Sequence, residues 1–301
     1  MQLATTITML AAARKNGYAI AAFNCENMEM IQGIIAAGEE MNAPLILQTT
    51  PSTISYASAE LFAANATAAA KSAFIPIALH LDHGNSHALV QDALGAGYTS
   101  IMIDGSTLPL EENIVFTKKA VELCVKLGIP VEGELGRVGG KEDDTVSDGP
   151  LYTDPGEAIK FVKETAVSSL AVGVGTVHGI YTKKPILNLE LISILREKLS
   201  VPLVLHGTSG LEDSVVKDCI ARGISKINIA TDLRITYTKA VREFLTNDPS
   251  CFDPKKYGAY GRDAVKKLAI ERILVCGCQG RADTNPGYSL RTTPTTPAAI
   301  I

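Results

Sequence analysis

Three of the five histidines fall within eight positions, in the segment HLDHGNSH at residues 80–87, together with Asp82. Imidazoles and carboxylates bind divalent metals and transfer protons, so this segment is compatible with a metal site, an acid–base site or a polar strand end. His83 and His87 are four residues apart, which would place both on one face of a helix. Because a glycine after His83 interrupts that path, we expect His87 to begin the next helix and His80 to support or pack beside the site.

The chain offers three imidazoles from three separate elements, because His83, His178 and His206 each lie at or after the end of a predicted strand. Three protein ligands that leave positions open are typical of a catalytic zinc, whereas a structural zinc is closed by four. The six cysteines are scattered, and the close pair Cys276 and Cys278 has no second pair to complete a zinc site. We therefore expect reduced thiols and a metal held by histidines.

Short runs of β-branched and apolar residues alternate along the chain with longer segments of helical spacing. Segments such as 27–41 and 110–128 repeat apolar residues every three or four positions, as an amphipathic helix requires. Eight strand–helix units with continuously apolar strands predict an α/β fold, a single-domain (β/α)8 TIM barrel. A doubly wound open sheet is the alternative, but no Gly-x-Gly-x-x-Gly follows the first strand. The predicted strands are 18–24, 43–49, 75–83, 100–105, 130–135, 169–175, 202–207 and 226–231.

Polar residues gather at the carboxyl ends of these predicted strands, where a barrel of this kind collects its chemistry. Any one of them alone would more often cap a turn than take part in a reaction. Their joint placement favours a functional site. They are Asn24, Asp82, His83, Asp104, Glu134, His178, His206, Asn228 and Thr231.

Two short loops after the last two predicted strands carry the signature of a phosphate site. They are HGTSG at 206–210 and NIAT at 228–231, both rich in small or hydroxyl-bearing residues. Glycine lets backbone N–H groups approach an anion, and a helix that begins near Leu211 would direct its positive end toward it. Barrels commonly hold a phosphate at this position.

Composition and charge limit which kinds of binding partner and how many domains we expect. The chain has 301 residues, 46% of them hydrophobic, and a formal net charge of -4. Such a chain can bury one large core, and it carries no field that would gather nucleic acid. Without a signal-like or membrane-spanning segment, we expect a cytoplasmic protein with a small-molecule partner. We expect a barrel domain over 1–282 and a disordered tail over 283–301, where threonine and proline dominate.

The motifs AAFNCEN, HLDHGNS, MIDGS, VEGELGRVGGKEDD, GTVHGIY, LHGTSG and KINIATDL together resemble the class II, metal-dependent ketose-bisphosphate aldolases, in that family's order and spacing. The likeness runs to Ala282. Because the chain closes on CGCQGRA and has Ala230 after Asn228 and Ile229, it looks more like the tagatose-1,6-bisphosphate branch than the fructose-1,6-bisphosphate branch. The two substrates are epimers at C4. The resemblance implies cleavage to dihydroxyacetone phosphate and glyceraldehyde 3-phosphate.

The resemblance assigns the central residues. His83, His178 and His206 would hold the zinc that stabilises the enediolate, and cobalt or iron could occupy the same imidazoles. Asp82 would be the acid–base group at the C4 oxygen. Glu142, in a stretch expected to be a mobile loop, would move the proton at C3. Neighbouring strand residues point to opposite faces, so Asp82 and His83 reach one site only if the strand turns, for which the following glycine is suited.

Other positions are implied with alternatives open. Asp104 and Glu134 would hold a second divalent ion or orient the histidines. A monovalent cation, Na⁺ or K⁺, can lie at the glycine carbonyls. Arg262 would bind the far phosphate, in this chain or from a neighbouring subunit, unless it is only a surface arginine. The residues expected at the substrate are Asn24, Thr50, Gly179, Gly207, Thr208, Ser209, Asn228, Ile229, Ala230, Thr231 and Arg262.

Three further expectations concern assembly and class. We expect a homodimer or homotetramer, with or without an accessory subunit. A zinc-dependent barrel hydrolase remains an alternative, but it needs no phosphate cradle after the last two strands. A non-catalytic barrel subunit of an aldolase complex is a further alternative. Such a subunit should have lost a ligand, and Asp82 and all three histidines are present.

Overall fold

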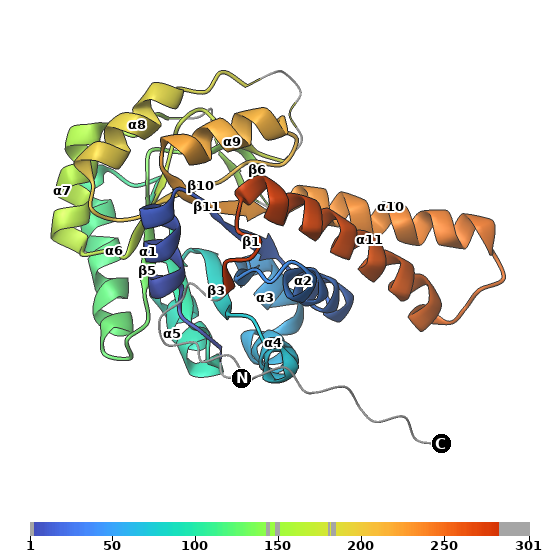
Figure 1. The fold of residues 1–301 in the computed structure, drawn as a ribbon. Coiled ribbons are helices and arrows are strands. Elements are labelled where there is room, and N and C mark those ends of the chain that lie inside the picture. Colours follow the sequence, from blue (N-terminus) through green and yellow to red (C-terminus); the bar gives the residue numbers. More distant parts are fainter. Residues whose placement is uncertain (1–2, 143–144, 148–150, 180, 182–184, 283–301) are drawn as a thin grey trace.

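The computed structural model describes residues 3–142, 145–147, 151–179, 181 and 185–282, and within them eight parallel strands form a closed barrel (Figure 1). Their order around the wall is β1-β11-β10-β8-β5-β4-β3-β2. The predicted single-domain TIM barrel is thereby confirmed, and each predicted strand overlaps an observed one. The bounds are β1 (Ile20–Asn24), β2 (Leu45–Thr49), β3 (Ile77–Gly84), β4 (Ser100–Ile103), β5 (Val131–Leu135), β8 (Ser169–Val172), β10 (Leu203–Leu205) and β11 (Ile224–Ile229).

Helices surround the barrel, and local sequence explains where several of them start and stop. The side chains of Asn27, Ser86 and Asp154 each accept a hydrogen bond from a first-turn backbone amide. Glycine in the left-handed conformation follows the last residue of several helices, as Gly97 does for α5. The helices are α1 (Thr6–Asn16), α2 (Met28–Glu40), α3 (Pro51–Ala57), α4 (Ala59–Ser72), α5 (His87–Ala96), α6 (Leu110–Val125), α7 (Pro155–Thr165), α8 (Leu189–Lys198), α9 (Asp213–Arg222), α10 (Thr231–Asn247) and α11 (Pro254–Cys276).

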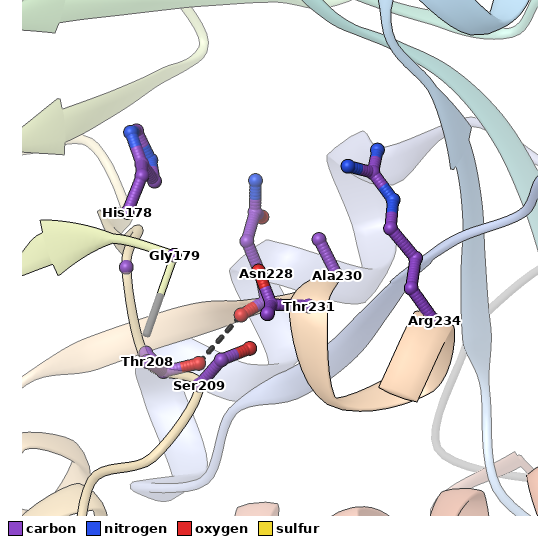
Figure 2. A pocket seen from close by; sticks show the side chains of 9 residues that line it. His178, Gly179, Thr208, Ser209, Asn228, Ala230, Thr231 and Arg234 are labelled. Carbon is purple, nitrogen blue, oxygen red and sulfur yellow. Dashed lines mark hydrogen bonds between the residues drawn. The ribbon is translucent and has the colours of Figure 1, made fainter. Parts of the chain in front are cut away.

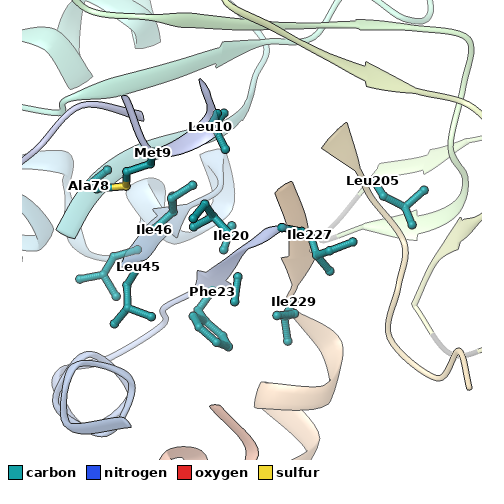
Figure 3. Close-up of a cluster of buried hydrophobic side chains, with 14 of the residues drawn as sticks. Met9, Leu10, Ile20, Phe23, Leu45, Ile46, Ala78, Leu205, Ile227 and Ile229 are labelled. Atoms are coloured by element: carbon teal, nitrogen blue, oxygen red, sulfur yellow. The ribbon is translucent and has the colours of Figure 1, made fainter. Parts of the chain in front are cut away.

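The hydrophobic core lies between the strands and the helices and continues to the amino end of the barrel. Strands β1, β2, β4, β5 and β11 are buried over their whole length. Met9 and Leu10 of α1 pack near Ile20, Ile46 and Ala78, where the helix closes that end (Figure 3). Full burial of one such side chain contributes about 1.5–3 kcal/mol. The framework that carries the polar strand ends is therefore a well-packed core.

A small second sheet lies outside the barrel, and it corrects one prediction. It contains β6 (Gly139–Glu142), β7 (Thr145–Ser147) and β9 (Val177–His178), in the order β7-β6-β9. The stretch around Glu142 was expected to be a loop, but it begins as a strand, and Glu142 pairs with Thr145 in an antiparallel ladder. The cause is that β9 offers a free edge with which Gly139 and Gly140 pair. This sheet carries His178 toward the barrel.

Helices α10 and α11 form a long antiparallel hairpin that extends away from the barrel (Figure 1). The first half of α11 packs against α2, where the backbone oxygen of Arg262 would lie 2.6 Å from a Cβ at Gly33. No helix in the described part of the chain is both long and apolar enough to span a membrane. All six cysteines are free thiols. The predicted tail over 283–301 lies outside the described residues.

Candidate metal and substrate site

Three histidines converge at the carboxyl end of the barrel from three separate elements. His83 is the second-to-last residue of β3, His178 ends β9 and His206 directly follows β10. One nitrogen from each ring lies within 4.8 Å of the others, and the ring centroids are 4.7 to 6.0 Å apart. The structure thus brings together the three predicted ligands. His80 and His87 stay outside this group, and His87 begins α5 as expected.

A distortion at the end of β3 directs neighbouring side chains into one site. His83 has a positive φ of 50°, and the pairing of β3 with β4 shifts its register between Leu81 and Gly84. A left-handed residue on a strand reverses the alternation of faces, so Asp82 and His83 both reach the barrel mouth. The turn therefore lies at His83 itself. Gly84 is needed for a different reason, because a Cβ there would lie 2.5 Å from the backbone oxygen of Met102.

Two carboxylates fix which ring nitrogens face the centre of the histidine group. His83 Nδ1 lies 2.9 Å from Asp104 Oδ2, and His206 Nε2 lies 2.9 Å from Glu132 Oε1. Ring N–H groups donate to these carboxylates, which leaves lone pairs on His83 Nε2 and His206 Nδ1. Those two nitrogens are 2.9 Å apart. Two lone pairs at that distance repel each other unless a cation is present, so the donor set fits a divalent metal.

The electrostatics of the group also favour metal binding. Burial, together with the nearby His83, lowers the pKa of His206 below its usual value despite the hydrogen bond to Glu132. His206 is therefore a neutral imidazole at neutral pH, which is the form that binds metal. Burial raises the pKa of Asp104, but the hydrogen bonds from His83 and from Ser106 outweigh it and lower the pKa to about 2.

A second group of potential ligands shares His83 with the first. The donor atoms of His83, Asp104 and Glu134 also lie within 4.8 Å of one another. Asp104 accepts hydrogen bonds from His83 Nδ1 and from the backbone amide of Ser106. Of the two roles expected for Asp104, the contacts support orientation of His83 directly. The carboxylates can hold a second ion as well, since oxygen donors suit hard cations.

Asp82 is completely buried beside the histidines and is surrounded by amide donors. Asn24 Nδ2 and Asn228 Nδ2 each lie 2.9 Å from one of its oxygens, and Gln48 Nε2 lies 3.3 Å away. Gln48 also donates to Asn24 Oδ1 at 2.7 Å. The carboxylate is therefore held in one orientation. Asn24, expected at the substrate, contacts Asp82 instead.

The predicted phosphate loops line a pocket next to the histidines (Figure 2). The first turn of α10 begins there at Thr231, so its backbone amides face the pocket with the positive end of the helix dipole. Thr208 Oγ1 donates to the backbone oxygen of Asn228 at 2.5 Å, which ties the two loops together. The lining residues are His178, Gly179, Gly207, Thr208, Ser209, Asn228, Ala230, Thr231 and Arg234.

Two features of this pocket suit a hydroxylated anion. Asn228 Oδ1 is buried and has no hydrogen-bond partner among the described residues, so it can accept a hydrogen bond from a ligand hydroxyl. Arg234 of α10 extends to the same side as His178 and Asn228 (Figure 2). Its guanidinium is paired with Glu26, with Nε 2.8 Å from Oε1. A ligand would therefore meet backbone amides at one end and a guanidinium at the other.

Some predicted residues lie elsewhere. Thr50 directly precedes α3 and its hydroxyl lies 3.1 Å from that of Thr53, and it is not among the residues that line the pocket. The side chain of Ile229 is 2% exposed and belongs to the core. Arg262 lies on α11, where its Nε is 3.3 Å from Asp263, and it does not line the pocket either. For Glu142 the structure describes the backbone alone.

Sequence reasoning missed four residues of this region: Gln48, Glu132, Lys226 and Arg234. A signal was present for three of them, because Gln48, Glu132 and Lys226 are polar residues inside strands that are buried over their whole length. A polar residue in such a strand has to find a partner inside the barrel. Arg234 gave no comparable signal, since an arginine in the first turns of a helix is ordinary on a surface.

Comparison with known proteins shows which family and which solved structures this chain resembles. A model of the family described as fructose-bisphosphate aldolase class-II matches residues 4–281. The YdjI aldolase from Escherichia coli K12 is 39% identical, with a TM-score of 0.84, over 93% of this chain and 100% of that one. A candidate fructose-1,6-bisphosphate aldolase from Coccidioides immitis is 31% identical, with a TM-score of 0.84, over 92% and 97%. A fructose-bisphosphate aldolase from Campylobacter jejuni, 22% identical over 92% and 96%, shares the fold with a TM-score of 0.78.

Proposed function

The chain belongs to the class II fructose-bisphosphate aldolase family and is a metal-dependent aldehyde-lyase, and from this premise we propose that it reversibly cleaves a ketose 1,6-bisphosphate. The products would be dihydroxyacetone phosphate and glyceraldehyde 3-phosphate. One observation carries the proposal. The three histidines and Asp82 lie next to the pocket lined by the predicted phosphate loops, here called the anion pocket, at the same end of the barrel. A hydrolase would not need that pocket, and a non-catalytic subunit would not need to keep the complete set.

We propose tagatose-1,6-bisphosphate as the preferred substrate and fructose-1,6-bisphosphate as the second. Support comes from the closing motif CGCQGRA and from Ala230 after Ile229, where the sequence resembles the tagatose branch. The epimers differ only at C4, so the discriminating contact lies close to Asp82, the group proposed for the C4 oxygen. The far phosphate requires a cation, for which Arg234 in the pocket and Arg262 from a neighbouring subunit are the two candidates.

The chemistry follows from the positions of the side chains. His83, His178 and His206 would hold a zinc ion, which supplies Lewis-acid stabilisation of negative charge on the substrate oxygens when bound. In cleavage, Asp82 would take the proton of the C4 hydroxyl as the C3–C4 bond breaks, which leaves an aldehyde. Glu142 would deliver a proton to C3 of the other fragment. In condensation both transfers run in reverse.

The remaining residues would bind and orient the substrate. Backbone amides around Gly207 and Thr231 would hold the phosphate of dihydroxyacetone phosphate, with hydroxyls from Thr208 and Ser209. Asn228 would accept a hydrogen bond from a substrate hydroxyl through its available oxygen. A second divalent ion at Asp104 and Glu134, and a Na⁺ or K⁺ ion at the glycine carbonyls, remain part of the proposal.

We further propose a homo-oligomer, a dimer or a tetramer. Phe252 at the tip of the α10–α11 hairpin is 93% exposed, and Tyr260 of α11 is 58% exposed. Large apolar side chains on a projecting hairpin are typical of a surface that another subunit covers. Light scattering coupled to gel filtration would measure the mass. An accessory subunit would be found as a copurifying second chain.

The test of the proposed function is a side-by-side cleavage assay on tagatose- and fructose-1,6-bisphosphate. Release of triose phosphate should stop after chelation and return with added zinc, and the preferred epimer should give the larger kcat/KM. Release that survives chelation would contradict the metal-dependent step. No release from either compound, with zinc shown to be bound, would overturn the bisphosphate proposal and direct the search to another phosphorylated ketose.

A further inference from the structure

A lysine and a glutamate lie inside the barrel, below the histidine group, where neither touches solvent. Lys226 on β11 is 0% exposed and Glu132 on β5 is 2% exposed, and Lys226 Nζ lies 2.9 Å from Glu132 Oε2. Taking two charges out of water costs several kcal/mol per ion, and a matched apolar pair would often be as stable. The barrel interior also contains apolar side chains, namely Met102, Ala171 and Val204. The ion pair therefore calls for an explanation other than stability.

The pair belongs to a continuous chain of buried hydrogen bonds that starts at the predicted metal ligand His206. From His206 Nε2 it passes to Glu132 at 2.9 Å and on to Lys226. Lys226 Nζ lies 3.4 Å from His80 Nε2, and His80 Nδ1 lies 2.7 Å from Ser100 Oγ. The chain ends at Thr6 of α1, 3.0 Å from Ser100. All six residues are at most 3% exposed.

The number of protons on each group determines which atom donates in each hydrogen bond of this chain. An ammonium group has donors and no acceptor, so Lys226 donates both to Glu132 and to His80 Nε2. His80 must then donate from Nδ1 to Ser100, whose hydroxyl is left to donate to Thr6. On the other side, the Glu132 carboxylate accepts from Lys226 with one oxygen and from His206 Nε2–H with the other. His206 is thereby restricted to the tautomer whose Nδ1 is bare and faces His83.

We propose that Glu132 and Lys226 are positioning residues for the metal site: they hold the His206 ring in the orientation and tautomer that present Nδ1 to the ion. The inference rests on the proposed role of His206 as a ligand. Partners of this kind, which hold metal-binding histidines, typically change metal affinity or activity by about 10–100-fold when replaced. Lys226 reaches the ion only through Glu132 and His206, so its effect has to pass along this chain.

The test measures zinc affinity by competition with a chromophoric chelator, together with the visible absorption spectrum of the cobalt-loaded protein. Glu132→Gln keeps the side-chain shape but places an amide between two donors, and Lys226→Met removes the ammonium at similar length. Each should weaken zinc binding about 10–100-fold and shift the cobalt bands, which report ligand geometry. The double variant E132Q/K226M, whose pair is neutral, should bind zinc more tightly than Lys226→Met alone.

Thr165→Val is the matched control, because Thr165 is buried on α7 and its hydroxyl donates to the backbone oxygen of Phe161, outside the network. It should lower the melting temperature without changing zinc affinity. Zinc affinities of Glu132→Gln and Lys226→Met within twofold of Thr165→Val, with unshifted cobalt bands, would overturn the proposal and leave the pair a structural feature. If Lys226→Met does not fold, Glu132→Gln decides the question alone.

These readouts are independent of aldol cleavage. A wild-type chain that binds zinc but cleaves neither bisphosphate would contradict the proposed function, while weaker zinc binding by the variants would still support the positioning role. A wild-type chain that binds neither zinc nor cobalt would overturn the positioning role together with the ligand assignment.

Discussion

The two halves of the candidate site are built from different parts of the chain. In the metal half, three reactive side chains are held by other side chains: His83 by Asp104, His206 by Glu132, and Asp82 by three amides. In the anion half, backbone amides, glycines and the start of α10 line the pocket. Side chains can be deleted one at a time, whereas backbone groups cannot. We therefore expect the metal half to be the more sensitive to substitution.

His206→Ala should have the largest effect, because it removes a ligand from the metal half. Zinc binding amounts to roughly 10–16 kcal/mol for the four ligands of a structural site, so one ligand is worth on the order of 3 kcal/mol, or about 10²-fold. Zinc content by atomic absorption and the rate of triose phosphate release should both fall to background. An active, metal-free His206→Ala protein would contradict the site assignment.

Asp82→Ala should separate two functions of the metal half, namely zinc binding and proton transfer to the substrate. We expect kcat to fall by about 10²–10⁴-fold, the usual contribution of a general acid–base group, while zinc content stays at the wild-type level. The measurement pairs single-turnover cleavage with metal analysis of the same sample. Loss of zinc along with activity would show that Asp82 supports the histidines and would remove it from the chemistry.

Gly207→Ala tests the point where the two halves meet, since Gly207 lies between His206 and Thr208. Its φ is 64°, and a Cβ there would lie 2.6 Å from the backbone oxygen of Val177, next to His178. Strain of about 1–3 kcal/mol should raise KM and weaken zinc binding together, each by roughly 10-fold. A change in KM alone would mean that the halves are mechanically separate.

Arg234→Met and Arg262→Met should separate the two cations proposed for the far phosphate. A charge-assisted hydrogen bond contributes about 1.5–3 kcal/mol, so the arginine that contacts this phosphate should raise KM about 10-fold when replaced, with kcat little changed. We expect this of Arg234, which lines the pocket. If Arg262→Met alone raises KM, the phosphate is bound by a neighbouring subunit. Unchanged KM in both variants would place the far phosphate elsewhere.

The sequence predicted most of the barrel, because its strands are short and mostly apolar runs, and it also predicted the three histidines that meet. The second sheet escaped prediction because β9 has two residues and β6 begins with two glycines, so neither has a usable period. A turn at the end of β3 was expected with the help of Gly84, but its position at His83 could not be foreseen, since a positive φ is rare outside glycine. Glu132 and Lys226 could be recognised in the sequence as charged residues within buried strands. That they form an ion pair could not be predicted, because it depends on how the barrel closes.

The buried pair has a consequence for how the barrel closes. Glu132 and Lys226 lie on strands that are not neighbours in the wall and are 94 residues apart in the chain. A slip of one residue in the pairing of β11 would turn Lys226 toward the helices and leave both charges buried without partners. Such a state costs roughly 3–5 kcal/mol. The two residues that orient His206 would therefore also destabilise barrels with a shifted strand during folding. In a barrel that has closed with the correct register, His206 already faces the other two histidines.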